Sequence, residues 1–201
     1  MNTRLREVAD IRSGYPFRGR VDNDPAGDVA VVSMRDVVPG QPLVATNLLR
    51  ISQTIVENVE KHLLEEDDVI FQSRGNRNHA AVIRGPLHGV AALGLYRIRP
   101  DHDQVSGEYL AWFLNQERFQ RSLSNIAQGS HIPFVPRAEL AMMRLPLPSL
   151  EEQRRISELH KLRERHRQVQ KELDDLTDKL VGEVKWRLAN SSDRTNKPIT
   201  E

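Results

Sequence analysis

The stretch Leu145–Gln153, with the sequence LPLPSLEEQ, divides the chain into two parts that follow different patterns. Pro146 and Pro148 cannot lie in the interior of a helix, so this stretch is predicted to be an extended edge strand or a linker. From Leu150 onward the sequence has no proline until the tail and becomes strongly charged. We therefore predict a domain over residues 1–148, a long helix over 149–188 and a flexible tail over 189–201.

The predicted helix carries a heptad pattern. Between residues 151 and 187 it has 10 basic and 9 acidic side chains, and six of its seven seam positions are apolar. The seam consists of Leu159, His166, Leu173 and Leu180 at position a, and Leu162, Val169 and Leu176 at position d. A narrow apolar seam on a charged helix requires a partner helix. A partner within this chain is one alternative, but no other segment matches its length and periodicity, so we expect an intermolecular partner.

His166 occupies a seam position where an apolar residue is expected. It could fix the register of the coil as a buried polar group. The alternative, which we prefer, is that its ring leans toward solvent at the edge of the coil.

The first 148 residues show the pattern of a mostly β domain with a packed helix, so the fold class is predicted to be α+β. Short β-branched runs bounded by glycine, proline and asparagine predict strands at residues 29–33, 69–71, 80–83 and 90–98. A short helix is predicted from about Thr3. Ser106 can cap a second helix, whose apolar face would include Leu110, Phe113, Leu114 and Phe119.

The charge is balanced overall but unevenly distributed. The net charge is +1, and residues 1–150 contain 17 acidic and 17 basic side chains. Of the basic side chains, 16 are arginine and one is Lys61. No acidic residue occurs in residues 11–21, 69–100 or 118–138. If these windows converge, the domain presents a positive face that suits a phosphate backbone. Two alternatives remain open: a GC-rich genome that favours arginine, and acids at 57–68 that fold back to neutralise the face.

The composition and motifs exclude several classes of protein. The absence of cysteine rules out disulfides, thiolate zinc sites and a cysteine nucleophile. No apolar run approaches the roughly 18 residues of a membrane span, and the first residues do not resemble a signal peptide, so we expect a cytoplasmic protein. We find no phosphate loop or cofactor loop, and expect no metal, no cofactor and no catalytic centre. The acids at 65–68 are interpreted as a solvated turn rather than a metal site or a nuclease motif, and His62 and His88 receive no role.

One loop has the chemistry of a base-reading element. It lies between two predicted strands and contains Arg74, Asn76, Arg77, Asn78 and His79. Arginine can bind guanine and asparagine can bind adenine, and Gly75 would allow close backbone approach. The alternative is an ordinary polar hairpin. Tyr15 and Phe17 could stack on a base, but aromatic pairs beside a turn are more often part of the core.

The order of landmarks along nearly the whole chain resembles the specificity subunits of type I restriction-modification systems. The matching stretches are SGYPFRG, VAVVSMRDV, DDVIFQSRGNRNHAAVI, GEYLAWFLNQERFQ, QGSHIPFV and LPLPSLEEQRRI. No single stretch is decisive, but together and in this order they are specific. The resemblance adds Arg18 and Arg35 as DNA-binding candidates, and suggests backbone phosphate contacts at Gly129, Ser130 and His131, where a plain turn is the alternative.

The resemblance also implies partners and a stoichiometry. A full-length specificity subunit has two target-recognition domains and two helices, whereas each landmark occurs once here, so the chain resembles half a subunit. A homodimer with antiparallel helices would then rebuild the two-domain arrangement and read a two-part DNA target. A methyltransferase subunit would bind S-adenosylmethionine and carry the catalytic residues, and a restriction and translocase subunit is a further expected partner. The alternative is an interaction protein whose helix modulates or blocks another specificity subunit or methyltransferase.

Overall fold

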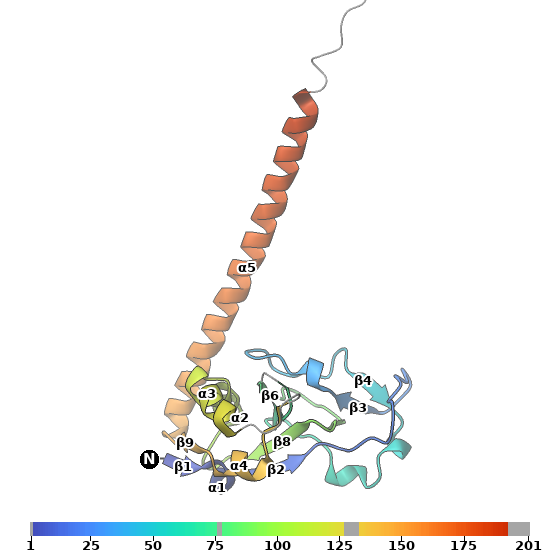
Figure 1. Cartoon of the computed structure of the whole chain (residues 1–201), viewed down its shortest axis with the longest axis vertical. Helices are drawn as coiled ribbons and strands as arrows, with labels where there is room; N and C mark the ends of the chain where they lie inside the picture. Colours follow the sequence, from blue (N-terminus) through green and yellow to red (C-terminus); the bar gives the residue numbers. More distant parts are fainter. Residues whose placement is uncertain (1, 76–77, 127–132, 193–201) are drawn as a thin grey trace, which may run out of the picture. The chain divides into compact units, whose positions relative to one another are not determined.

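A computed structural model describes residues 2–75, 78–126 and 133–192. It has the predicted α+β character, with short strands and helices followed by one long helix (Figure 1). In chain order the elements are β1 (Asn2–Arg4), α1 (Leu5–Val8), β2 (Ala9–Ser13), β3 (Val29–Val32), η1 (Met34–Asp36), β4 (Leu49–Ile51), η2 (Gln53–Ile55), η3 (Val59–Lys61), β5 (Val69–Gln72), β6 (Ala80–Val82), β7 (Gly89–Ala91), β8 (Leu95–Pro100), α2 (Gly107–Leu114), α3 (Glu117–Ile126), α4 (Arg137–Met142), β9 (Arg144–Pro146) and α5 (Leu150–Ser192). The contacts divide the chain into two units, residues 1–160 and 161–201.

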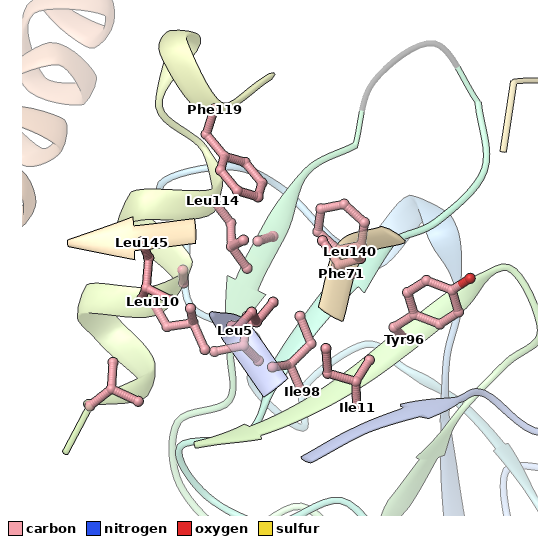
Figure 2. Packing of buried hydrophobic residues seen from close by; sticks show 14 of the residues in the cluster. Leu5, Ile11, Phe71, Tyr96, Ile98, Leu110, Leu114, Phe119, Leu140 and Leu145 are labelled. Atoms are coloured by element: carbon pink, nitrogen blue, oxygen red, sulfur yellow. The ribbon is translucent and has the colours of Figure 1, made fainter. Parts of the chain in front are cut away.

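Two sheets form the centre of the first unit. An antiparallel sheet has the strand order β2-β8-β5-β6, and a smaller sheet has the order β4-β3-β7, in which β3 and β7 are parallel. One face of the larger sheet, with Phe71 and Ile98, packs against α2, α3 and α4. Figure 2 shows Leu110 and Leu114 of α2 in this cluster. The other face, with Ile70 and Leu95, packs against the smaller sheet.

The predicted strand over residues 90–98 is wrong in one respect, because the chain forms two strands there. β7 ends at Ala91 and β8 begins at Leu95, and the two belong to different sheets. Gly94, with a φ of 97°, lies in the turn between them. A positive φ favours glycine, so this residue permits the chain to leave one sheet and join the other.

The predicted N-terminal helix and the Ser106-capped helix are both found in shorter form. β1 precedes α1, so the helix begins at Leu5 rather than near Thr3. The Ser106 hydroxyl accepts a hydrogen bond from Tyr109 N at 3.3 Å, as expected of an N-cap. The helix ends at Leu114, where the Asn115 amide turns back to bond Ala111 O and Ala80 O, both at 2.8 Å. Phe119 therefore belongs to a separate helix, α3.

The proline-rich stretch forms an edge strand that leads into the long helix. β9 pairs with β1, with Leu145 opposite Thr3. Ser149 and Glu152 then form a capping box: Ser149 N donates to Glu152 Oε2 at 2.9 Å, and Glu152 N donates to Ser149 Oγ at 3.3 Å. α5 continues to Ser192, four residues beyond the predicted end at Leu188. In the part of the chain that the structure describes, no helix has the length and apolarity needed to cross a membrane.

Gln153 fixes the start of α5 within the first unit. Its side chain is fully buried. The amide nitrogen donates to Gln104 O at 2.8 Å and Pro148 O at 2.9 Å, and the amide oxygen accepts from Ser106 N at 3.0 Å. Two of these contacts join the first turn of α5 to the segment that leads into α2, and the third holds the residues just before α5.

We expect Gln153→Ala to lower the free energy of unfolding by about 3 kcal/mol, because it removes three part-buried hydrogen bonds made by one buried amide. Urea unfolding followed by circular dichroism measures this change. Gln168→Ala, at an exposed site on the same helix, is the matched control and should change stability by less than about 0.5 kcal/mol. A loss in Gln153→Ala no larger than in the control would contradict the assignment.

Candidate nucleic-acid interface

Two of the three acid-free windows meet beside the end of β5. The backbone of Arg74 forms an isolated antiparallel β-bridge with Phe134, and Gly75 N donates to Pro133 O at 2.9 Å. The Arg74 guanidinium lies over the Phe134 ring, 5.7 Å from its centroid. These contacts tie the backbone at Arg74 and Gly75 to residues 133–134, while the Arg74 side chain is exposed, as a residue that contacts DNA requires.

Asn78 and His79 lie on the other side of the same loop. Asn78 is 8% exposed, and its amide donates to Gln72 O at 2.8 Å. His79 N donates to the Gln72 side chain at 3.2 Å. These hydrogen bonds join the two ends of the loop. For Asn78 they agree with the alternative that the loop is an ordinary polar hairpin. A base contact by Asn78 remains a prediction, and it would require the bond to Gln72 to open.

Several predicted DNA-binding residues lie outside the described residues. They are Asn76, Arg77, Gly129, Ser130 and His131.

The third window forms a different surface, at the end of β2. The backbone of Tyr15 forms a parallel β-bridge with Ala92. The Tyr15 ring packs edge-on against the Phe17 ring, with centroids 4.9 Å apart. Both rings are partly buried against the β3–β4–β7 core, in agreement with the interpretation of this pair as core. Arg18 and Arg20 line an adjacent cavity of about 340 Å³ with these aromatic rings. Arg18 is thus placed beside a cavity wide enough for a polar ligand group.

Arg35 lies on η1, directly after β3. Its guanidinium is exposed, and its Nε is 3.8 Å from Asp36. The Asp36 carboxylate is already bonded by Ser33 N at 2.7 Å and by the Ser33 hydroxyl at 2.6 Å. Arg35 remains available for a contact outside the chain, because its own ion pair is long and solvent-exposed.

Some arginines of the acid-free windows form ion pairs with acidic residues at 65–68, in line with the alternative that acids at 57–68 fold back to neutralise the positive face. Arg99 donates to Asp68 from Nε at 2.8 Å and to Glu65 at 2.5 Å. The hydrogen bonds that Arg99 donates to Asp68 are the main cause of a raised pKa for Arg99. Arg84 pairs with Asp67 at 3.0 Å and with Glu108.

The solvated-turn interpretation of the acids at 65–68 is therefore wrong for Asp68, which is 1% exposed. Asp68 accepts from Arg99 and from Glu65 N, so it is a buried ion-pair partner that closes the turn before β5. Asp67 is partly buried and accepts from Gly107 N at 2.7 Å. These carboxylates hold α2 and β8 to the turn.

The heptad seam is exposed on the isolated chain. Leu159 and Leu162 are 68% and 65% exposed, and Leu176 and Leu180 are 62% and 66% exposed. Val169 and Leu173 are about half exposed, and His166 is exposed as well. Large apolar side chains at heptad spacing with this exposure are typical of a helix that pairs with another.

His62 had no predicted role, and Lys61 and Arg97 entered the sequence prediction only as positive charges. In the structure these three residues line one small hollow together with Arg12. Arg12 and Arg97 are direct cross-strand partners in β2 and β8. Period-two alternation could have placed Arg97 and Arg99 on one face of β8, but only the register of the sheet shows that Arg12 lies opposite.

Three known proteins resemble this chain in sequence or in fold. The specificity subunit of the type I restriction enzyme MjaIX from Methanocaldococcus jannaschii is 21% identical over 155 residues, which is 77% of this chain and 35% of the relative. The crystal structure of the HsdS subunit from Thermoanaerobacter tengcongensis matches with a TM-score of 0.62 and 22% identity, over 83% of this chain and 37% of that one. A chain from a structure of type I restriction-modification complex assembly matches with a TM-score of 0.65 and 20% identity, over 92% of this chain and 43% of that one.

This chain therefore spans less than half the length of each of these relatives. The structural likenesses establish the fold, while the family follows from a sequence model. The model of the type I restriction modification DNA specificity domain matches residues 1–173. Specificity subunits are the non-catalytic recognition components of their complexes, in agreement with the expected lack of a catalytic centre. The chain belongs to the family of type I restriction modification DNA specificity domains.

Proposed function

We propose that this protein reads a DNA sequence on behalf of a methyltransferase. The observation that carries the proposal is the match of residues 1–173 to a DNA specificity domain. The loop that carries Arg74 supports it, because two of the three acid-free segments meet there and the Arg74 guanidinium lies over the Phe134 ring. Arg18, Arg35, Arg74 and His79 are the described DNA-binding candidates, together with Asn78 if its loop opens.

The chemistry of methylation belongs to a partner in this proposal. A methyltransferase subunit binds S-adenosylmethionine and supplies the catalytic residues, and this chain contributes the choice of target. A restriction and translocase subunit is the second partner where the system also cleaves DNA. The complex acts in the cytoplasm, where its DNA substrate lies.

Two copies of the chain pair through α5, with the helices antiparallel. The exposed leucines at heptad spacing support this arrangement, because an isolated helix would leave them in water. A two-fold axis across an antiparallel pair relates two identical readers, so their target is an inverted repeat with an interruption.

A second candidate function rests on the same exposed seam. The helix could bind the coil of another specificity subunit or of a methyltransferase and thereby alter or block its choice of target. DNA binding separates the two functions: a reader binds one sequence preferentially in the presence of its methyltransferase, and a modulator shows no preference of its own.

Removal of the Arg74 guanidinium should weaken binding to the preferred sequence. We expect Arg74→Gln to raise the Kd about tenfold or more if the arginine contacts a base, since a good bidentate contact contributes about 1–3 kcal/mol. Fluorescence anisotropy with labelled duplexes measures the Kd in the presence of the methyltransferase. Arg144→Gln, at an exposed arginine of the edge strand β9, is the matched control. Equal affinities for the two variants would remove Arg74 from the interface.

The dimer proposal predicts a mass of twice the 23.0 kDa chain in sedimentation equilibrium. Leu173→Gln should raise the dimer Kd at least tenfold, because a seam leucine would be replaced by a polar group in the contact. Glu172→Gln, one residue away and off the seam, should leave the Kd unchanged. A wild-type protein that remains monomeric at micromolar concentration, or a Leu173→Gln protein that dimerises normally, would contradict the pairing.

A further inference from the structure

The larger sheet carries a cluster of cations near its β2 edge, on the face opposite α2. Arg12 of β2 lies directly across from Arg97 of β8. Like charges directly opposite in an antiparallel pair repel each other. One carboxylate serves both: Asp10 Oδ2 is 2.8 Å from Arg12 Nε and 2.9 Å from an Arg97 guanidinium nitrogen. The pair therefore keeps an excess of positive charge.

Two further basic residues reach the same place from another part of the chain. Lys61 ends η3, and His62 follows it. Together with Arg12 and Arg97 they line a hollow with room of about 10 Å³ for a water-sized group. The His62 ring packs edge-on against Tyr15, with centroids 5.1 Å apart.

Gly14 brings the end of β2 into this arrangement. A Cβ there would lie 2.1 Å from Ala92 O, so only glycine allows the backbone of β2 to approach β7 this closely. Tyr15 N then donates to Ala91 O at 2.7 Å, which fixes the wall of the hollow.

The Nε of Arg97 is buried without a hydrogen-bond acceptor in the part of the chain that the structure describes. Its side chain is 7% exposed. Within the described residues, Arg97 Nε is the only buried side-chain nitrogen or oxygen without a hydrogen-bond partner. A buried donor without a partner costs about 1–3 kcal/mol, and native proteins reserve such groups for strain, a ligand or a bound ion.

The electrostatic surroundings agree with an anionic ligand. The pKa of His62 lies below its ordinary value, first because of burial and then because of the charges on Arg97, Arg12 and Lys61. The pKa of Arg97 is also lowered, by burial and then by the charge on Arg99, although Asp68 and Asp10 oppose this effect. Both groups therefore lie within the influence of neighbouring positive charges.

We propose that Arg12, Lys61, His62 and Arg97 bind one backbone phosphate of DNA, of which a single oxygen atom enters the hollow. The proposal rests on the DNA-reading function proposed above and adds a contact that positions the duplex without reading its sequence. Guanidinium and ammonium groups are the usual partners of a phosphate oxygen. The ring of Tyr15, already packed against Phe17 and His62, is not free to stack on a base.

The test uses the salt dependence of DNA binding by the full chain with its methyltransferase. Lys61→Gln should reduce the slope of log K against log salt by about 0.9, and weaken binding about 5- to 10-fold at 0.1 M salt. The same loss is expected on the preferred sequence and on unrelated DNA, since a phosphate contact carries no base information. Arg12→Gln should behave in the same way. Arg6→Gln removes an exposed charge from α1 that does not line the hollow, and should keep the wild-type slope.

A second readout separates this site from the proposed function. Inorganic phosphate, added to the wild-type protein during a ¹³C NMR titration of the histidine rings, should raise the pKa of His62 because the bound anion offsets the nearby cations. Lys61→Gln should reduce that rise. Sequence-specific DNA binding with an unchanged salt slope in Lys61→Gln would overturn the phosphate site alone. Failure of the wild-type protein to bind DNA would overturn the DNA-reading function and the DNA source of the phosphate. An unmoved His62 would overturn the anion site itself.

Discussion

The buried amide of Gln153 is the contact on which the arrangement of the first unit depends. It ties the first turn of α5 to the carbonyls of Gln104 and Pro148 and to the backbone of the Ser106 cap. The two prolines before it keep the chain extended, so β9 can pair with β1 before the helix begins. The beginning and end of the recognition domain therefore meet where the long helix starts.

The sequence predicted elements well where one local pattern decided them. The Ser106 cap, the strands at 29–33, 69–71 and 80–83 and the long heptad helix all follow from short-range rules, and all are present. The sequence failed where tertiary contacts decided. Residues 90–98 look like one strand, but Gly94 sends the two halves into different sheets. Phe119 fits the apolar face of the preceding helix, yet Asn115 ends that helix by bonding to β6.

The same limit applies to the candidate site. The acid-free windows drew attention to Arg74, which stays a prediction, but no sequence rule could show that Asp68 would be buried against Arg99. Asn78 was chosen for its base-reading amide, and that amide is bonded within its own loop. The hollow around Arg97 depends on three segments distant in sequence, which only the register of β2 with β8 and the position of η3 bring together. A net charge of +1 therefore does not reveal that some arginines are paired with carboxylates while other basic side chains gather in one hollow.

We propose that two identical readers, joined by antiparallel helices, choose one DNA target for a methyltransferase. Mapping of methylated bases, after co-expression of this chain with its methyltransferase in a host without other methylation, tests it most directly. We expect a single motif made of two inverted half-sites separated by a spacer of fixed length. Methylation at one uninterrupted asymmetric sequence, or methylation without sequence preference, would contradict it.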